Sequence, residues 1–235
     1  MAGARRKQER VEDLSAMIAP VGKDTMNDRV YRELRSLIMT GAFAPGAELI
    51  LREVAQVMGT SLMPVRDSMK RLVSEHALAA LPSGRMVIPV LNAERFEEIK
   101  RIRLMLEGEA VALAATRISK KQLAVVKSIV KSLSTLEPDN RMEFWKLNQK
   151  LHFSVYEAAG SPLLMAMIES LWLQLGPLLT RIPVSRALQG SVDPHQLLLG
   201  ALEKGEPEAA RAALVADISA SSVQVIAVLE GQSRT

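Results

Sequence analysis

Cysteine is absent from this chain of 235 residues, and aromatic residues make up only 3% of it. Without cysteine the protein can form no disulfide framework, no thiolate nucleophile and no cysteine-based zinc or iron–sulfur site. The chain is nevertheless long enough to bury the core of one large domain or of two ordinary ones, because 48% of its residues are hydrophobic. We therefore expect a fold that is stabilised by packing alone.

An export signal and a membrane span are also lacking. The basic residues at the amino terminus are followed by Glu12, Asp13 and Asp24, where a secretory signal would need an unbroken apolar stretch. The longest apolar region, 161–179, is interrupted by polar residues such as Glu169, which favours a buried helix over a membrane span. We expect a soluble, cytoplasmic protein without a membrane partner.

A strong charge of one sign is missing as well. Lysine and arginine together number 30, against 26 for aspartate and glutamate. When the chain is divided at Asn92, the counts are 13 against 10 before it and 17 against 16 after it. This mild basic excess in the first part is compatible with a nucleic-acid surface and equally with an ordinary solvated domain.

The first part of the chain carries local start and stop signals. Residues 1–24 show no sustained apolar period and mix both signs of charge, so we expect a flexible tail. A helix is predicted to begin after Thr25, which has Asp28 three residues later as in a capping box, and to end at Gly41.

The segment after this helix predicts a helix-turn-helix and a wing. A short helix is expected at 51–58, and the hydroxyl of Ser61 can cap a second, amphipathic helix. Two short helices separated by a few residues are typical of a helix-turn-helix. Apolar runs at 78–81 and 85–90 around a Pro-Ser-Gly turn then predict a β-hairpin, which in this position would be a wing.

The remainder of the chain, 92–231, is helical in character and shows no sustained strand pattern. Six helices are predicted from N-cap residues and prolines, at Asn92, Ser119, Asp139, Ser161, Asp193 and the segment from Gly205 to Pro207. The expected fold class is mainly α, with an N-terminal winged helix-turn-helix domain at 25–91 followed by an all-α helical bundle at 92–231.

Ordered motifs run along both of these predicted domains. They are Val30 to Gly41, Pro45 to Leu49, Ala55 to Gly59 and Pro64 to Leu72 in the first, and Arg103 to Glu107, Asn148 with His152 and Phe153, Gly160 to Leu163 and Ala201 to Gly205 in the second. Together they cover about 25–230 and resemble the GntR superfamily of bacterial transcription regulators, in its FadR subfamily with the FCD-type helical effector domain. The resemblance implies a homodimeric regulator, most often a repressor, that binds operator DNA and senses a small molecule in the bundle.

Candidate DNA-contacting residues lie on the second helix of the helix-turn-helix and around it. Because this helix enters the major groove with its N-terminus first, its candidates are Ser61, Met63, Arg66 and Lys70. Arg66 is the strongest, since a guanidinium can contact O6 and N7 of guanine together. Candidates for phosphate or minor-groove contacts are Arg52 on the preceding helix and the wing residues Ser83, Gly84 and Arg85. For each charged residue, an ordinary solvated helix face is the alternative.

The chain departs from the family pattern at two places in this region. The family commonly has Glu where this chain has Leu51, and Arg-Thr where this chain has Leu62 and Met63. Because the missing arginine removes one DNA partner per protomer, we expect an operator different from the common one of the subfamily and a lower affinity.

A candidate metal site combines spacing with the resemblance. Asn148 and His152 are four residues apart on one predicted helix, so both side chains project from one face at a distance that suits two ligands of one metal. Metal-binding members of the family use an Asp and three His, and the matching positions here are Asn148, His152, His195 and Asp217. Such a set suits Zn, Ni or Mn, although a neutral amide replaces an anion. The alternative is that both histidines are hydrogen-bonded polar core residues.

Arg103 is the candidate effector-binding residue. The resemblance implies an arginine near the ligand cavity at this position. An ion pair with Glu107, four residues later, is the alternative, but an Arg that precedes its Glu is in the less favourable order on a helix. We therefore expect a small organic acid as effector, bound by a charge-assisted contact. Nothing in the sequence indicates an organic cofactor.

Two other classes of function remain to be compared with a regulator. A metal-dependent all-α enzyme could use a cluster of His152, His195 and Asp217, but the sequence shows no nucleophile motif, no Gly-rich phosphate loop and no His-Glu-x-x-His pattern. An all-α protein–protein adaptor would leave the helix-turn-helix and the hairpin unexplained. Salt-dependent retention on DNA distinguishes the regulator from both.

Overall fold

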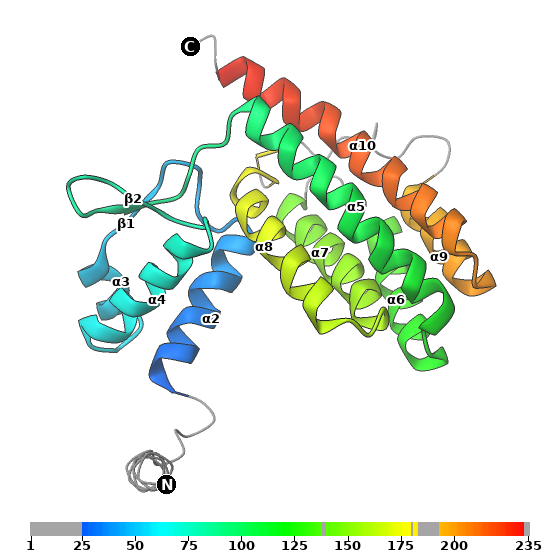
Figure 1. Ribbon diagram of the computed structural model, residues 1–235, viewed down its shortest axis with the longest axis horizontal. Coiled ribbons are helices and arrows are strands. Elements are labelled where there is room, and N and C mark those ends of the chain that lie inside the picture. The colour runs from blue at the N-terminus through cyan, green and yellow to red at the C-terminus, as the bar shows by residue number, and fades with distance from the viewer. Residues whose placement is uncertain (1–24, 138–139, 180, 183–192, 233–235) are drawn as a thin grey trace, which may run out of the picture.

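The computed structural model describes residues 25–137, 140–179, 181–182 and 193–232, so the tail predicted at 1–24 lies outside the described residues. Element labels follow Figure 1. The first part of the chain contains α2 (Met26–Met39), β1 (Glu48–Leu49), α3 (Leu51–Val57), α4 (Leu62–Ser74), β2 (Ala79–Ala80) and β3 (Met86–Val87). The second part contains α5 (Ala93–Arg117), α6 (Lys120–Ser134), α7 (Arg141–Ala158), α8 (Pro162–Leu179), α9 (Pro194–Lys204) and α10 (Pro207–Gln232).

The first helix begins with the predicted capping box. The backbone N–H of Asp28 donates to Thr25 Oγ1 at 3.2 Å, and the backbone N–H of Thr25 donates to the Asp28 carboxylate at 3.3 Å. Further along, α2 packs on α4. The buried residues of the two helices include Val30, Leu34 and Ile38 on α2 and Val65, Met69 and Leu72 on α4, which follow helical spacing. These apolar faces form the core of a helix-turn-helix, as the sequence predicts.

The turn between α3 and α4 contains a left-handed glycine and corrects the prediction about Ser61. Gly59 has a φ of 61°, a left-handed conformation that glycine adopts without a Cβ clash. Ser61 is the N-cap residue of α4, but its side chain makes no capping hydrogen bond. Ser61 is exposed, so water can satisfy the first N–H groups of α4 and no protein partner is required.

The wing is a small antiparallel sheet in the order β1-β3-β2. The predicted hairpin is present but shorter than its apolar runs, because the ladder pairs only Ala79 with Val87 and Ala80 with Met86. Prolines in the turn and after β3, which have no N–H to donate, limit its length. Strand β1 on the other edge of β3 was not predicted from the sequence, since two residues are too few to show an alternating pattern.

Six described helices form the bundle, as the sequence predicts, and most start where predicted. Asn92 caps α5, Ser119 forms a capping box with Gln122 at α6, Asp193 caps α9, and prolines begin α8 and α10. Asp139, the predicted start of the helix α7, lies outside the described residues, and Asn140 occupies the N-cap position. Figure 1 shows α5 and α10 side by side, and these helices pack closely. Both carry small buried residues, Ala110 and Ala114 on α5 and Ala210 and Ala213 on α10.

The two parts of the chain meet where α2 packs on α8. A Cβ at Gly176 of α8 would overlap the backbone carbonyl oxygens of Ile38 and Met39, so only glycine permits this approach. Nearby, Arg35 Nη2 donates to Glu169 Oε2 at 2.8 Å. Helix α8 is therefore in direct contact with the helix-turn-helix.

Two of the described helices, α8 and α10, are long and apolar enough to cross a membrane by length and composition alone. Core helices of soluble proteins pass the same test, so it is weak support for a span. In α8 the buried residues include Ile168, Trp172 and Leu175, consistent with the predicted buried helix.

Candidate metal and effector site

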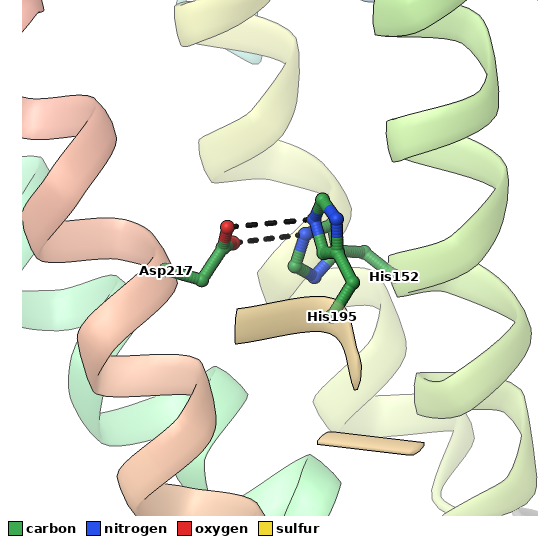
Figure 2. A group of neighbouring side chains, drawn as sticks. All are labelled: His152, His195 and Asp217. Carbon is green, nitrogen blue, oxygen red and sulfur yellow. Dashed lines mark ion pairs between the residues drawn. The ribbon is translucent and has the colours of Figure 1, made fainter. Parts of the chain in front are cut away.

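Two histidines and an aspartate from three helices meet inside the bundle. His152 comes from α7, His195 from the first turn of α9 and Asp217 from α10, and one ligand atom of each lies within 4.8 Å of the others. His152 Nε2 lies 3.1 Å from Asp217 Oδ2, and His195 Nε2 lies 3.4 Å from Asp217 Oδ1. Figure 2 shows both imidazole rings facing the carboxylate.

All four residues of the predicted metal site line one cavity of about 250 Å³. Asn148, the fourth, lies one helical turn before His152 on α7 and is buried. Arg103 of α5, the predicted effector residue, lines the same cavity. The structure thus brings together residues that are more than one hundred positions apart in the chain.

Hydrogen bonds around His152 determine which of its ring nitrogens carries a proton. Tyr156 Oη donates to Glu107 Oε2 at 2.6 Å, so the same hydroxyl accepts from His152 Nδ1, which lies 3.1 Å away. A neutral His152 therefore turns the lone pair of Nε2 toward the carboxylate of Asp217. Two acceptors 3.1 Å apart are stable only with a positive centre between or beside them, either a proton on Nε2 or a cation.

His195 has a second ring nitrogen whose lone pair has no donor in the part of the chain that the structure describes. Its Nε2 atom is buried and has no hydrogen-bond partner among the described residues. Its Nδ1 atom lies 3.4 Å from Asp193 Oδ1, so an Nδ1–H directed there leaves a lone pair on Nε2. A buried polar atom without a partner costs about 1–3 kcal/mol, which coordination to a metal would offset.

Asp217 supplies the negative charge of the cluster. Burial would raise the pKa of its carboxyl group, but the hydrogen bond and charge of His152, with the charges of His195 and Arg103, lower it to about 2. Asp217 is therefore a carboxylate at neutral pH. Two imidazole nitrogens, one carboxylate and a nearby amide oxygen form a donor set that fits Zn, Ni or Mn.

Arg103 corrects one sequence argument. Arg103 precedes Glu107 on the helix, which is the less favourable order for an ion pair, yet the pair is formed. Arg103 Nε donates to Glu107 Oε1 at 2.6 Å, and Nη2 donates to Oε2 at 3.1 Å. Trp172 Nε1 donates to the same carboxylate at 3.0 Å. The pair is strong here because both residues are buried, which the helix order does not reveal. Arg103 needs no ligand to balance its charge, although it still lines the cavity and its Nη1 is not used by this pair.

The predicted DNA-contacting residues lie on one exposed part of the molecule. Ser61, Met63, Arg66 and Lys70 are exposed on α4, as are Arg52 on α3 and the wing residues Ser83, Gly84 and Arg85. Figure 1 places α3, α4 and the strands on the side away from α6 and α9. Arg85 contacts Glu48 at 2.7 Å and Ser83 Oγ at 3.2 Å, so DNA would compete with these partners for it.

Several residues in the cavity wall or next to it were not identified from the sequence. Tyr156 and Trp172 hold the carboxylate of Glu107, and Trp145 lines the cavity beside Asn148. Tyr156 follows His152 by four residues, which is the only sequence signal for its position. The tryptophans carry no spacing signal that distinguishes a cavity wall from an ordinary core.

Comparisons with known families and proteins agree with this architecture. Residues 26–88 match the family described as bacterial regulatory proteins, gntR family, and residues 98–220 match the FCD domain. The chain is 32% identical over 202 residues to the HTH-type transcriptional regulator McbR of Escherichia coli (strain K12), covering 84% of this chain and 91% of that protein.

Two further similarities extend along most of the chain. It is 29% identical over 187 residues to a probable D-xylose utilization operon transcriptional repressor of Paenarthrobacter nicotinovorans, covering 78% of this chain and 81% of that one. The solved structure of E. coli McbR/YncC matches with a TM-score of 0.78 at 31% identity, over 89% of this chain and 99% of that one.

Proposed function

Because the chain belongs to the GntR family of bacterial transcription regulators, with an FCD domain, we propose that a small carboxylate and a divalent metal in its bundle cavity control its affinity for operator DNA. The protein is a DNA-binding regulator and not an enzyme. GntR-type regulators bind operator DNA and small-molecule effectors. The observation that carries the proposal is the cluster of His152, His195 and Asp217 in a cavity that Arg103 also lines.

The chemistry of the cavity favours an acid. His152, His195 and Asp217 would hold the metal, with the carboxamide of Asn148 as a weaker oxygen donor. A bound divalent cation would supply positive charge in excess of the single carboxylate and leave coordination positions for a ligand. Arg103 lies in the same wall and can donate from Nη1 while Glu107 retains the other nitrogens.

Helix α8 provides a physical connection from the cavity to the DNA-binding part. Trp172 lines the cavity, Glu169 pairs with Arg35 of α2, and Gly176 packs on the end of α2. Since α2 packs on α4, a shift of α8 would change the position of α4, the helix that enters the major groove. The short segment before α5 offers a second route, from the bundle to the wing. A coupling of about 1–3 kcal/mol would change operator affinity roughly 5–150-fold.

On the DNA side, we propose a homodimeric, cytoplasmic repressor. A two-fold dimer presents two α4 helices to two half-sites of a roughly palindromic operator. Arg66 would contact a base, and the exposed side chain of Met63 would meet a thymine methyl group, the apolar feature of the major groove. Ser61, Lys70, Arg52 and the wing residues Ser83, Gly84 and Arg85 would contact phosphates or the minor groove.

Metal content provides the first test. The parent protein, purified without a chelator or a polyhistidine tag, is expected to carry or take up about one divalent ion per chain. His152→Ala is expected to lose this ion, because the best-oriented nitrogen donor of the cluster is removed. Asn148→Asp is expected to bind the ion more tightly, since an anionic ligand replaces a neutral one. Elemental analysis and thermal denaturation with added Zn²⁺ or Ni²⁺ measure both effects.

A histidine outside the cavity supplies the matched control. His76 is exposed at the end of α4, so His76→Ala should keep the metal content of the parent. If the parent carries no stoichiometric metal and added Zn²⁺ or Ni²⁺ leaves its melting temperature unchanged, the two histidines are hydrogen-bonded core residues and the metal is excluded from the proposal.

Screening of small organic acids tests the effector. Acids are expected to raise the melting temperature and to change operator affinity, measured by fluorescence anisotropy of a labelled duplex. In Arg103→Lys the affinity for the acid is expected to fall about 10–100-fold, because a charge-assisted contact contributes about 1.5–3 kcal/mol. Lysine is chosen because its charge still neutralises the buried carboxylate of Glu107.

Arg101 is the control for this substitution, because it is exposed on the same helix and does not line the cavity. Arg101→Lys should respond to acids as the parent does. The carboxylate proposal is wrong if the only stabilising compounds are neutral or cationic, or if Arg103→Lys binds acids as tightly as the parent.

A further inference from the structure

Aromatic side chains are scarce in this sequence, yet they gather at the cavity. The chain has four phenylalanines, two tryptophans and two tyrosines. Both tryptophans and Phe144 line the cavity, while Phe153 and Tyr156 pack against each other and against the rings of Trp172 and His152. Five of the eight aromatic residues therefore line the cavity or pack against residues that line it.

The two tryptophans use their indole N–H groups differently. Trp172 Nε1 donates to Glu107 at 3.0 Å and is thereby part of the Glu107 network. Trp145 is 8% exposed, and its Nε1 atom is buried without a hydrogen-bond partner among the described residues. A buried indole N–H usually has a partner, so this donor is available to an acceptor that the described residues do not provide.

The cavity wall combines polar and apolar residues. Its polar residues include the metal-binding cluster and Arg103, whereas Leu133, Phe144, Trp145 and Leu179 contribute apolar surface. Its volume of about 250 Å³ exceeds what a carboxylate group alone would fill. A cavity of about 150 Å³ is sufficient to hold benzene, so there is space for a ring-sized body in addition to the acid group.

We propose that the effector is an acid with a ring-sized apolar body that carries a hydrogen-bond acceptor of its own, and that Trp145 selects it through this acceptor. The inference rests on the proposed carboxylate effector and specifies its chemical class. The carboxylate points to Arg103 and the metal-binding cluster, the body lies among Leu133, Phe144 and Leu179, and an ether, hydroxyl or carbonyl oxygen accepts from Trp145 Nε1.

Matched ligands test this directly on the full-length protein in the presence of Zn²⁺. The probes are acetate, benzoate, the three methoxybenzoate isomers and the three ethylbenzoate isomers, which differ from their methoxy counterparts by having a methylene group in place of the ether oxygen. Binding is measured by isothermal titration calorimetry and by quenching of tryptophan fluorescence, since both tryptophans lie in the cavity wall.

The parent is expected to bind benzoates more tightly than acetate, and to prefer at least one methoxybenzoate over the matching ethylbenzoate by about three- to tenfold, as a single neutral hydrogen bond permits. Trp145→Phe retains a ring of similar shape but removes the N–H. It is expected to bind both members of the pair with affinities within about twofold of each other, with Trp172 as the remaining fluorescent reporter.

Three outcomes would overturn the inference, and they have different consequences for the proposed function. If acetate binds as tightly as the benzoates, the ring-sized body is wrong but the carboxylate effector stands. If the methoxy preference is absent in the parent or persists in Trp145→Phe, the role of Trp145 is wrong while the cavity remains the site. If no acid binds and only neutral probes quench the tryptophans, the carboxylate effector is itself wrong.

Discussion

Replacement of Glu107 by alanine is expected to lower the free energy of unfolding by about 3–5 kcal/mol, because it leaves a buried arginine without its counter-charge. Glu107 is fully buried and accepts from Arg103 through two nitrogens, from Tyr156 and from Trp172. All three donors lose their partner at once. Urea denaturation followed by circular dichroism measures the effect.

An exposed glutamate on the same helix provides the control for this prediction. Glu109 pairs with Arg211 at 3.0 Å, but its side chain is 53% exposed, so Glu109→Ala is expected to cost less than about 1 kcal/mol. If Glu107→Ala is too unstable to purify, Glu107→Gln allows the measurement with a milder loss. Equal effects at Glu107 and Glu109 would show that the buried network does not stabilise the fold.

A double substitution separates the charge pair from its packing. Arg103→Met combined with Glu107→Met removes both charges and retains much of the volume. It is expected to recover a large part of the stability lost in Glu107→Ala, since apolar replacement of a whole buried ion pair is often neutral or stabilising. The double variant is expected to lose the response to acids even if it is stable, because the effector arginine is gone.

Arg66→Ala is expected to remove specific operator binding. A bidentate contact to guanine contributes about 1–3 kcal/mol of discrimination, and a two-fold dimer would make the contact in both half-sites. Arg66 is exposed on α4 and is not one of the buried residues of that helix, so the substitution should leave the fold intact. Titration against a selected operator and against an unrelated duplex measures the loss of specificity.

Two controls decide whether Arg66 reads a base. In the parent, replacing the contacted guanine by 7-deazaguanine should weaken binding, and in Arg66→Ala the same replacement should have no further effect. Arg52→Ala is expected to weaken binding to both duplexes alike and to reduce the salt dependence, as loss of a phosphate contact does. If Arg66→Ala behaves in the same way as Arg52→Ala, then Arg66 is a phosphate contact and another residue reads the operator.

The local structure of this protein was predictable from its sequence. The capping boxes at Thr25 and Ser119 and the six helices of the bundle all depend on residues a few positions apart. Such interactions form within about one helical turn, so the identities of neighbouring residues are enough to predict them. The short strand β1 is the exception, because its pairing partner β3 lies almost forty residues away.

The candidate metal site could be only half predicted from the residues alone. The spacing of Asn148 and His152 places two donors on one helix face, and this much is local. His195 and Asp217 come from two other helices, and only the resemblance to a family linked them to the pair before the structure placed all four around one cavity. Spacing along the chain contains no information on which helix faces meet.

The chain's local signals by themselves determined the elements of this protein and their order, whereas the tertiary structure alone decided the chemistry of the cavity. Burial made the pair of Arg103 and Glu107 strong, although its order on the helix is unfavourable. Packing brought Gly176 against α2 and left Trp145 Nε1 without a partner among the residues that the structure describes. These properties depend on desolvation and on contacts between distant segments, and both arise only when helices far apart in sequence enclose the same space.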